Sequence, residues 1–586
     1  MSRQARVSLQ EVRSKVAEQQ AIGVQVQGKP AARQPRGSRV RVRRRTIVAS
    51  LAGVLAVAVV YLCALREASA VQVQSDSAAM ALQGWAMAHG NVLLHGWRLA
   101  DVSFYTIEVP LYALAGLALG LRPDIVPACS AATFTILVAA AALVARGQRR
   151  GLAGAAAAGI ATAVMAGPVL RVAGTLLTEP DHTGTAIVPL VLALVIDRAG
   201  RGRRAAALTC LVLAWGLVED SLVVLVGVAP VVIVGLARAG RAAATPPGEP
   251  AGPPDASPAG PPSGRRGSTR YEALLAGAAV AAVVVAEAAK ALIRLAGGWV
   301  LDGNGHQFVT GQDLAGNAGG TLQDVLQLFS ASPLGQPVGV GVVLVAIHLV
   351  LAGMVVAGCW LALRRLFWSG DMVAVLLAAG ISANLAAYTL LYVTGPATIQ
   401  DIAPVFGMGA ALAGRVLGGP LARWWQARRS GPALPLLGAW AAVVVCVSIP
   451  PLVTARPAAA DNGALATWLA DHGLHSGIAQ YWQANSVTLD SGGTVTMRDV
   501  WDYGTAGGIR PYPWEEDTSL LDPRRNDANF VVAAAQSGLT VPSIEQRFGL
   551  PARSYQVGEF TVLVYGRNLL PTLSGLPAPY PGRIGW

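Results

Sequence analysis

The fold is decided by two neighbouring stretches, TIVASLAGVLAVAVVYLCAL at Thr46–Leu65 and SDSAAMALQGWAMAHGNVLLHGWRLAD at Ser75–Asp101. The first carries no charge and is long enough to cross a bilayer, which takes about 20 helical residues. The second mixes Asp, His, Trp and Arg with enough apolar residues to lie against lipid. Within it, Leu82, Trp85 and His89 follow helical spacing, which is typical of a helix in the headgroup zone. The pair predicts a membrane protein with a long outer loop after its first span.

The amino-acid composition supports an integral membrane protein. Of the 586 residues, 53% are hydrophobic and only 13% are charged, whereas a soluble globular protein carries about 25% charged residues. Lys and Arg exceed Asp and Glu by 45 to 33, but the excess lies in short loops between apolar runs. It does not form a nucleic-acid-binding patch. We therefore expect a membrane-embedded chain without a nucleic-acid partner.

Apolar runs divide the chain into eleven candidate transmembrane helices. A further run, 104–121, is assigned to the membrane surface as an interfacial helix, because a crossing there would put the basic loop Arg146–Arg150 outside the cell. With 104–121 at the surface, every Arg-rich loop falls on the cytoplasmic side, which Lys and Arg prefer. The eleven runs are 46–65, 124–145, 152–170, 184–197, 205–219, 221–237, 272–296, 336–362, 371–393, 402–418 and 434–453.

The termini and loops set the remaining organisation. Residues 1–45 form a basic cytoplasmic tail, and 46–453 form the transmembrane domain, in which 66–123 is an outer loop with interfacial helices. The Pro-rich stretch 243–270 cannot pack a core, so we expect a disordered cytoplasmic linker. From 455 to 586, short runs such as GEFTVLVYGRN have strand character. The expected fold is an all-α polytopic membrane protein with a C-terminal extracytoplasmic α/β domain.

Charged residues at the predicted outer surface form the candidate site. A carboxylate there can deprotonate a hydroxyl acceptor or hold a divalent cation, and Lys or Arg can bind a lipid phosphate. Each residue also has a plainer interpretation, as a solvated loop acid, a turn or helix cap, or a lysine that extends to the headgroups. The acids are Asp76, Asp101, Glu108, Glu179, Asp181, Glu219, Asp220, Asp302, Asp313, Asp324 and Asp401, the basic residues at the same level are Arg98, Arg171, Lys290 and Arg294, and His182 lies next to Asp181.

Three features resemble the GT-C class of membrane glycosyltransferases, which includes protein O-mannosyltransferases and the aminoarabinose transferases of lipid A. Asp76, in QSDSAAMALQGWAMAHGN, matches the acidic residue that follows the first span of the class. Pro110 and Tyr112 match the start of its surface helix. Asp181, or Glu179, matches its second acid at the fourth span. The segments DVSFYT, PDHTGT and YWQANSVTLDSGG are also similar to those of actinobacterial multi-pass membrane proteins.

The resemblance implies a GT-C-like fold and a transferase that moves a sugar from a polyprenyl-phosphate donor to an acceptor on the outer face. The acceptor, a glycan or a protein, is left open. The resemblance implies that Asp76 acts as the catalytic base and that Asp181 and His182 assist it. Asp76 and Asp181 are the expected ligands of a divalent cation, Mg²⁺ or Mn²⁺. The expected phosphate- or substrate-binding residues are Arg98, Lys290, Arg294, Glu108, Glu219 and Asp220.

Three features depart from the pattern of the class. Asp76 stands alone between serines, where members often have a paired acid. Val109 stands where some members have Lys, and Glu219-Asp220-Ser221 replaces a Lys-Gly pair between the fifth and sixth spans. The alternative is therefore a non-catalytic GT-C-like protein that binds a glycan or a partner in envelope assembly. A transporter is disfavoured, because transporters place buried charges at mid-membrane. Neither a Walker-type phosphate loop nor a dinucleotide fingerprint occurs in the sequence.

The arginine distribution predicts that the N-terminus and the Pro-rich loop are cytoplasmic and that 455–586 lies outside. In intact cells, an impermeant thiol reagent should label the Ser491→Cys variant and leave the Ser257→Cys variant unlabelled. Equal labelling of the two variants would contradict this topology.

Overall fold

The computed structural model describes residues 36–100, 102–166, 176–177, 182–244, 265–300, 308–334, 339–366, 370–391, 396–427, 456–458, 462–504, 508–534, 536 and 538–573. The chain divides into two compact units, 1–59 and 60–586. In the first unit the described residues belong to helix α2 (Arg36–Ala68), which continues into the second. The predicted span 434–453 lies outside the described residues, as does the predicted linker except for its two helical ends.

Seven described segments are helical, apolar and long enough to cross a membrane, so the chain is a multi-pass membrane protein. The predicted crossings 152–170, 184–197 and 205–219 are occupied by shorter helices, namely α6 (Gly151–Met165), α8 (Ile187–Arg198) and α9 (Arg203–Glu219). Eleven crossings are therefore not confirmed. The seven segments are Leu51–Ala68 in α2, Ile125–Arg146 (α5), Val224–Arg241 in η1 (Val224–Val228) and α10 (Ala229–Ala244), Arg270–Leu295 in α11 (Arg265–Leu295), Gly341–Leu363 in α13 (Val340–Leu363), Met372–Leu391 (α14), and Thr398–Ala427 in η2 (Pro396–Ile402) and α15 (Ala403–Ala427).

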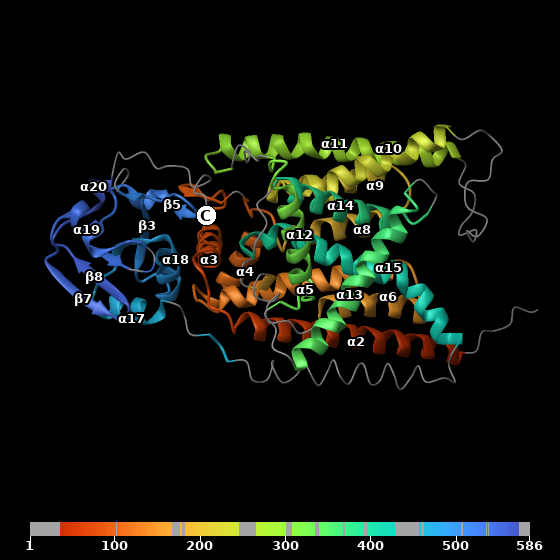
Figure 1. The fold of residues 1–586 in the computed structure, drawn as a ribbon, viewed down its shortest axis with the longest axis horizontal. Coiled ribbons are helices and arrows are strands. Elements are labelled where there is room, and N and C mark those ends of the chain that lie inside the picture. The colour runs from red at the N-terminus through yellow and green to blue at the C-terminus, as the bar shows by residue number, and fades with distance from the viewer. Residues whose placement is uncertain are drawn as a thin grey trace, which may run out of the picture. The chain divides into compact units, whose positions relative to one another are not determined.

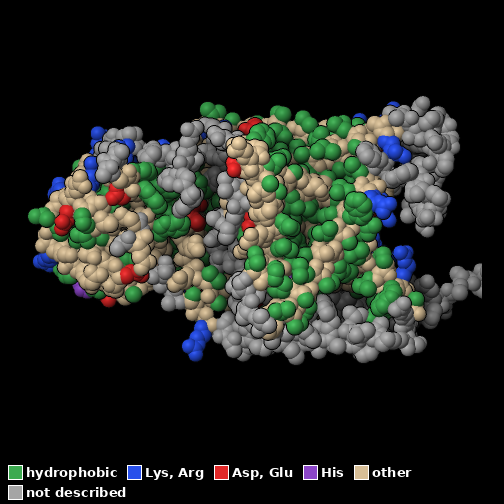
Figure 2. All heavy atoms as spheres, in the orientation of Figure 1, with side chains coloured by type: hydrophobic (Ala, Val, Ile, Leu, Met, Phe, Trp, Pro, Cys, Tyr) green, Lys and Arg blue, Asp and Glu red, His purple; other side chains and the backbone are tan. Residues whose placement is uncertain are grey.

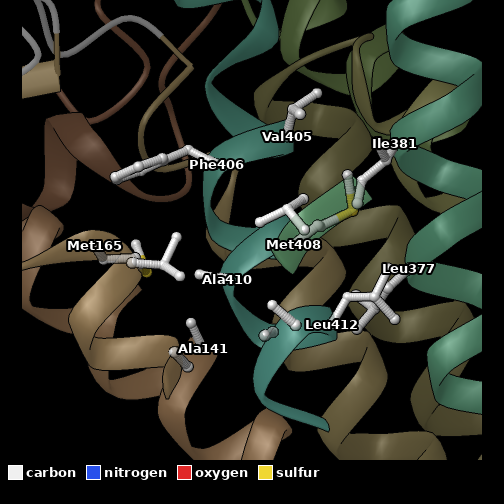
Figure 3. Close-up of a cluster of buried hydrophobic side chains, with 14 of the residues drawn as sticks. Ala141, Met165, Leu377, Ile381, Val405, Phe406, Met408, Ala410 and Leu412 are labelled. Atoms are coloured by element: carbon white, nitrogen blue, oxygen red, sulfur yellow. The ribbon is translucent and has the colours of Figure 1, made fainter. Parts of the chain in front are cut away.

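Helix α15 lies at the centre of the helical domain. In an 18-residue apolar window of its candidate span 83% of the residues are buried, more than in the window of any of the other six segments. Figure 3 shows Met408 of α15 directed toward Ile381 of α14, while Ala410 faces Met165 of α6. Burial on all sides explains why the α15 sequence is apolar around its whole circumference and not along one stripe.

Small residues let α15 and α6 approach closely. Gly414 and Gly418 are spaced as in a GxxxG motif, which favours close contact between membrane helices. A Cβ atom at Gly418 would lie only 2.5 Å from the Ala157 Cα of α6, whereas a Cβ at Gly419 would meet nothing within 4 Å. The packing of α6 against α15 therefore depends on the missing side chain at Gly418.

Arginines from several predicted cytoplasmic loops meet at one end of the helices. Arg415 donates to Asp197 and to Asp371, each at 2.6 Å, and Arg149 donates to the Arg415 carbonyl oxygen at 2.6 Å. Arg238 donates to the Leu366 carbonyl oxygen at 3.3 Å. Figure 2 shows Lys and Arg side chains gathered toward this end.

The predicted outer loop folds into α3 (Ser75–Ala88), β1 (Trp97–Arg98) and α4 (Glu108–Leu119). Helix α4 has 12 residues, too few to cross a bilayer as a helix on its own, and the surface position of 104–121 stays a prediction. In Figure 1, α3 runs across the direction of the long helices. A Cβ atom at Gly84 would lie 2.5 Å from the Tyr112 Cβ, so α3 and α4 pack in direct contact.

The C-terminal part contains a mixed six-stranded sheet in the order β4-β3-β2-β6-β8-β7. The central strand β2 pairs in parallel with β3 and β6, and the other pairings are antiparallel. The predicted α/β character is present. The strands are β2 (Ser476–Gln480), β3 (Thr496–Asp502), β4 (Ile509–Pro511), β6 (Phe530–Ala533), β7 (Arg553–Val557) and β8 (Phe560–Val564), and the helices are α17 (Gly463–Asp471), α18 (Tyr481–Asp490), η4 (Thr518–Leu521), α19 (Val541–Phe548) and α20 (Leu570–Leu573). The remaining helix of the helical domain is α12 (Leu314–Leu328).

A side chain at Gly418 should separate α15 from α6. We expect Gly418→Val to destabilise the detergent-purified protein by roughly 1–3 kcal/mol, the usual cost of overpacking a tight contact. The matched control is Gly353→Val in α13, where a Cβ atom would meet nothing within 4 Å, so that it carries the same intrinsic helix cost without the clash. A melting temperature equally low for both variants would show that the contact with Ala157 is not what matters.

Candidate functional site

Three segments of the helical domain meet at His182, which precedes α8. Its Nδ1 lies 2.5 Å from the carboxylate of Asp220, in the turn after α9, and its Nε2 lies 3.2 Å from Asp401 of η2. The side chains of His182 and Asp220 are 11% and 2% exposed, and that of Asp401 is 19% exposed. Asp401 is therefore the most exposed side chain of a largely buried cluster.

Both ring nitrogens of His182 face carboxylates, which favours the imidazolium form. Burial alone lowers the pKa of His182, but Asp220 and Asp401 outweigh it and raise the pKa well above its usual value. Burial also disfavours a charged Asp220, yet the charge of His182 lowers the pKa of this carboxyl, with help from hydrogen bonds. The donors are the Leu222 N–H and the Thr185 hydroxyl, each at 2.7 Å. His182 and Asp220 therefore form a buried ion pair at neutral pH.

The backbone at His182 is held in a strained conformation. Its φ is +57°, in the left-handed region that costs an L-residue roughly 1–2 kcal/mol. Such strain persists only where surrounding contacts impose it, and it is common at functional sites. The Gly184 N–H donates to Glu108 at 2.7 Å, and the Asn384 side-chain amide donates to the Asp401 carbonyl oxygen at 3.1 Å. These bonds hold the two segments that bring His182 and Asp401 together.

A second pair of acids lies where α4 begins. Glu219 accepts hydrogen bonds from the backbone N–H groups of Thr106 at 2.6 Å and Ile107 at 3.0 Å, as an anion does at a helix N-terminus. Glu108 is only 1% exposed. Burial, reinforced by the charge of Glu219, raises the pKa of Glu108 well above its usual range. The hydrogen bond from the Gly184 N–H lowers this pKa but does not offset the rise. This pair fastens the outer loop to α9 and to the segment that carries His182.

Asp76 lies in the first turn of α3 and contacts the C-terminal domain. It is half-buried and accepts a hydrogen bond from the hydroxyl of Tyr481, the first residue of α18. Gln74 is the N-cap of α3, so Asp76 does not cap the helix. Burial raises the pKa of Asp76, against the lowering effect of the Tyr481 hydrogen bond. A raised pKa brings a carboxylate closer to the range in which a general base works at neutral pH.

The predicted basic residues gather where α11 meets the outer loop. The Arg98 guanidinium lies 4.6 Å from the centroid of the Trp299 ring, and Arg294 donates to the neighbouring Val300 carbonyl oxygen at 3.2 Å. Lys290, one turn earlier on α11, pairs with Glu287 at 3.1 Å. Arg98 and Arg294 therefore both contact the segment Trp299–Val300.

The structure joins some predicted residues and leaves others apart. His182 joins Asp220, and Glu108 shares a hydrogen-bonded network with Glu219. Asp181 lies outside the described residues. The pairing of His182 with Asp401 was not anticipated, because no local spacing links the two positions. Tyr481 was also missed, since its hydrogen bond to Asp76 joins residues 405 positions apart.

The predicted ligands of a divalent cation are Asp76 and Asp181, and Asp181 lies outside the described residues. Within the described ranges, no group of three or more His, Cys, Asp or Glu side chains is arranged to hold a metal ion. Asp76 binds Tyr481 through Oδ1, and the Mg²⁺ or Mn²⁺ site stays a prediction.

The His182 cluster should stabilise the fold most strongly near pH 6. Its folded-state pKa lies above the unfolded value of about 6.5, so its contribution is complete below that pH and is lost as the pH rises through the folded-state pKa. Asp220, with a lowered pKa, loses its contribution only as the pH falls through its own folded-state pKa. Thermal unfolding of wild type and His182→Gln should therefore differ clearly at pH 6 and much less at pH 10.

The expected difference at pH 6 is roughly 3 kcal/mol, the cost of breaking a buried ion pair. The exposed His472 of the C-terminal domain supplies the control His472→Gln, which should melt like wild type at both pH values. A gap between wild type and His182→Gln that is as wide at pH 10 as at pH 6 would contradict the ion pair.

Comparison with known proteins shows which fold this chain shares. No family model and no curated protein sequence matches it. Its structure is similar to the crystal structure of ArnT from Cupriavidus metallidurans bound to undecaprenyl phosphate, with a TM-score of 0.52 and 13% sequence identity. This match covers 90% of the chain and 99% of ArnT.

Two crystal structures of the Archaeoglobus fulgidus oligosaccharyltransferase also match. One is tethered to an acceptor peptide containing the NVT sequon, with a TM-score of 0.42 and 12% identity over 84% of this chain and 72% of that chain. The other is a complex with Zn and sulfate, with a TM-score of 0.44 and 12% identity over 86% and 73%. ArnT and the oligosaccharyltransferase are both GT-C glycosyltransferases, and the likeness to ArnT confirms that this chain has the GT-C-like fold predicted from its sequence.

Proposed function

We propose that the chain is a membrane glycosyltransferase that moves a sugar from a polyprenyl-phosphate donor to an acceptor on the outer face of the membrane. The observation that carries the proposal is the fold that 90% of the chain shares with ArnT bound to undecaprenyl phosphate. The predicted topology fits this role, with about eleven crossings, a cytoplasmic N-terminus and the C-terminal domain outside. In this arrangement Asp76, His182 and Arg98 lie on the donor's side of the bilayer.

In the proposed reaction, Asp76 acts as general base. The acceptor hydroxyl oxygen attacks the anomeric carbon, the bond from that carbon to the phosphate oxygen breaks, and polyprenyl phosphate leaves. The hydroxyl proton passes to the Asp76 carboxylate. Support comes from the position of Asp76 in the outer loop and from the burial that raises its pKa. Asp181 keeps its predicted assisting role as part of the proposal.

The proposed phosphate-binding group consists of Arg98, Arg294 and Lys290. Arg98 and Arg294 approach the same segment, Trp299–Val300, and Lys290 lies on α11 one turn before Arg294. Guanidinium groups bind phosphate oxygens through two parallel hydrogen bonds, which suits a lipid phosphate as it gains charge in the transition state. No comparable group of Lys and Arg was predicted elsewhere in the outer loop.

The His182 cluster is proposed to hold the second side of the site. His182 and Asp220 are almost fully enclosed, so they act through Asp401, the most exposed member of the cluster. The imidazolium fixes one face of Asp401 and leaves its other oxygen to accept a hydrogen bond from a sugar hydroxyl. His182 thus assists by positioning an acid, in line with its predicted assisting role.

One observation favours the alternative of a non-catalytic protein that binds a glycan or an envelope partner. Glu219 and Asp220 stand where the class often carries Lys-Gly, and both are engaged within the protein. Glu219 holds the start of α4, and Asp220 holds His182. These two positions therefore contribute no positive charge to a donor phosphate, which leaves donor binding to Arg98 and its neighbours.

Replacing Asp76 tests the proposed function directly. A positioned general base contributes roughly 10²–10⁴-fold to the rate, so Asp76→Asn should lose at least about 99% of transfer. Purified wild type and variant are assayed for release of polyprenyl phosphate from a panel of polyprenyl-phosphate sugars, with envelope extract as acceptor. The reactions are run with and without Mg²⁺ or Mn²⁺.

The matched control is Asp471→Asn, which neutralises an exposed acid at the end of α17 and should retain full activity. An active wild type with an equally active Asp76→Asn would remove Asp76 from the mechanism. Wild type that consumes no donor under any condition would favour the non-catalytic alternative.

A further inference from the structure

The C-terminal domain contacts the outer loop at two places. Strand β1 of the loop pairs antiparallel with β5 (Glu516–Asp517) of the domain, with Trp97 opposite Asp517. The Gly96 carbonyl oxygen accepts hydrogen bonds from the N–H of Thr518 at 2.9 Å and from its hydroxyl at 2.6 Å. The second contact lies between α3 and α18, which are also neighbours in Figure 1. The loop that carries Asp76 is thus covered by a domain from the other end of the chain.

Tyr481 lies at the centre of the second contact. It follows β2 directly, at the carboxyl end of the parallel strands, where open α/β sheets usually place functional side chains. Its hydroxyl binds Asp76 Oδ1 and lies 3.0 Å from Glu515 Oε2. The Ser75 hydroxyl donates to the Tyr481 carbonyl oxygen at 2.5 Å. Both the backbone and the side chain of Tyr481 are therefore fixed to the start of α3.

The surroundings of Tyr481 hold its ring in one orientation. Tyr481 is 3% exposed, and its ring centroid lies 5.3 Å from those of Tyr512 and Trp482 in edge-to-face contacts. Glu515, which contacts the hydroxyl from the far side, is 2% exposed and has a φ of +50°. A glutamate in the left-handed region is strained, and such strain is typical of positions that serve a site.

We infer that Tyr481 is a positioning residue of the transfer site, through which the C-terminal domain orients the carboxylate of Asp76. This inference rests on the proposed function, because it assigns a role to Tyr481 only through Asp76. A half-buried carboxylate in the first turn of a helix has rotational freedom, and a hydrogen bond to one oxygen selects one rotamer. Tyr481 occupies Oδ1, which leaves Oδ2 to take the proton of the acceptor hydroxyl. The catalytic site is then built from both ends of the chain.

A plainer role for Tyr481 is to fasten the two domains without affecting the reaction. The two roles make different kinetic predictions. A residue that only fastens the domain would change stability, or change activity by releasing the domain. A positioning residue changes kcat while the domain stays in place and donor binding is unaltered, because a misplacement of about 1 Å can cost roughly 10²-fold in rate.

The test is Tyr481→Phe in the full-length protein, which removes only the hydroxyl and keeps the ring contacts. We expect kcat to fall by about 10- to 100-fold with KM for the donor unchanged. The matched control is Tyr565→Phe, which removes a 3.0 Å hydrogen bond to the Gly549 carbonyl oxygen within the same domain and should leave kcat as in wild type. Amide hydrogen exchange at Trp97 and Arg98 reports whether β1 and β5 remain paired.

Each outcome decides a separate question. A fall in kcat for Tyr481→Phe, with β1 still protected and the control active, supports the positioning role. Unchanged kcat, or a fall accompanied by faster exchange in β1, overturns it. If Asp76→Asn is active while Tyr481→Phe is not, the assignment of Asp76 fails and the inference fails with it. If Asp76→Asn is inactive while Tyr481→Phe is fully active, the proposed function stands and only the inference is lost.

Discussion

The ion pair of His182 with Asp220, extended to Asp401, is the interaction on which the candidate site depends most. It joins the start of α8, the end of α9 and the turn before α15, three segments far apart in sequence. Uncompensated charges cost several kcal/mol each when buried. The three side chains are therefore stable only together, and their mutual requirement fixes the relative positions of three helix ends. The backbone of His182 lies in the left-handed region, a strain that persists only where surrounding contacts impose it.

At the opposite ends of the helices, buried charges are also paired, here through other residues. Arg415 lies within a candidate membrane span, yet it is bound by Asp197 and Asp371 and by the Val144 carbonyl oxygen. Apolar packing around α15 sets how close the helices lie, and the polar clusters at their ends set which helix ends meet. This division follows from the solvent, because lipid rewards no particular apolar contact between helices but strongly penalises an unpaired charge.

Local sequence patterns predicted the features that depend on local physics. Apolar length predicted a multi-pass chain, and seven described segments are long enough to cross a membrane. The predicted eleven crossings are not confirmed, because α6, α8 and α9 are apolar but shorter than a full span. The surface position of 104–121 and the cytoplasmic side of the basic loops stay predictions. The resemblance of Asp76 and its neighbours to the GT-C class anticipated the fold. Composition and spacing carry no information about which distant residues will meet, so the partners of Asp76 and His182 became visible only in three dimensions.

The contact between Asp76 and Tyr481 also affects when, during synthesis of the chain, the site is completed. The two residues are separated by 405 positions, and ribosomes add roughly 5–20 residues per second. A nascent chain therefore exposes the outer loop for about 20–80 s before the domain that completes it has been made. If the orientation of Asp76 depends on Tyr481, a truncated or unfinished chain turns over donor lipid far more slowly than the complete protein. The order of synthesis would then act as a built-in safeguard against premature use of lipid-linked sugar.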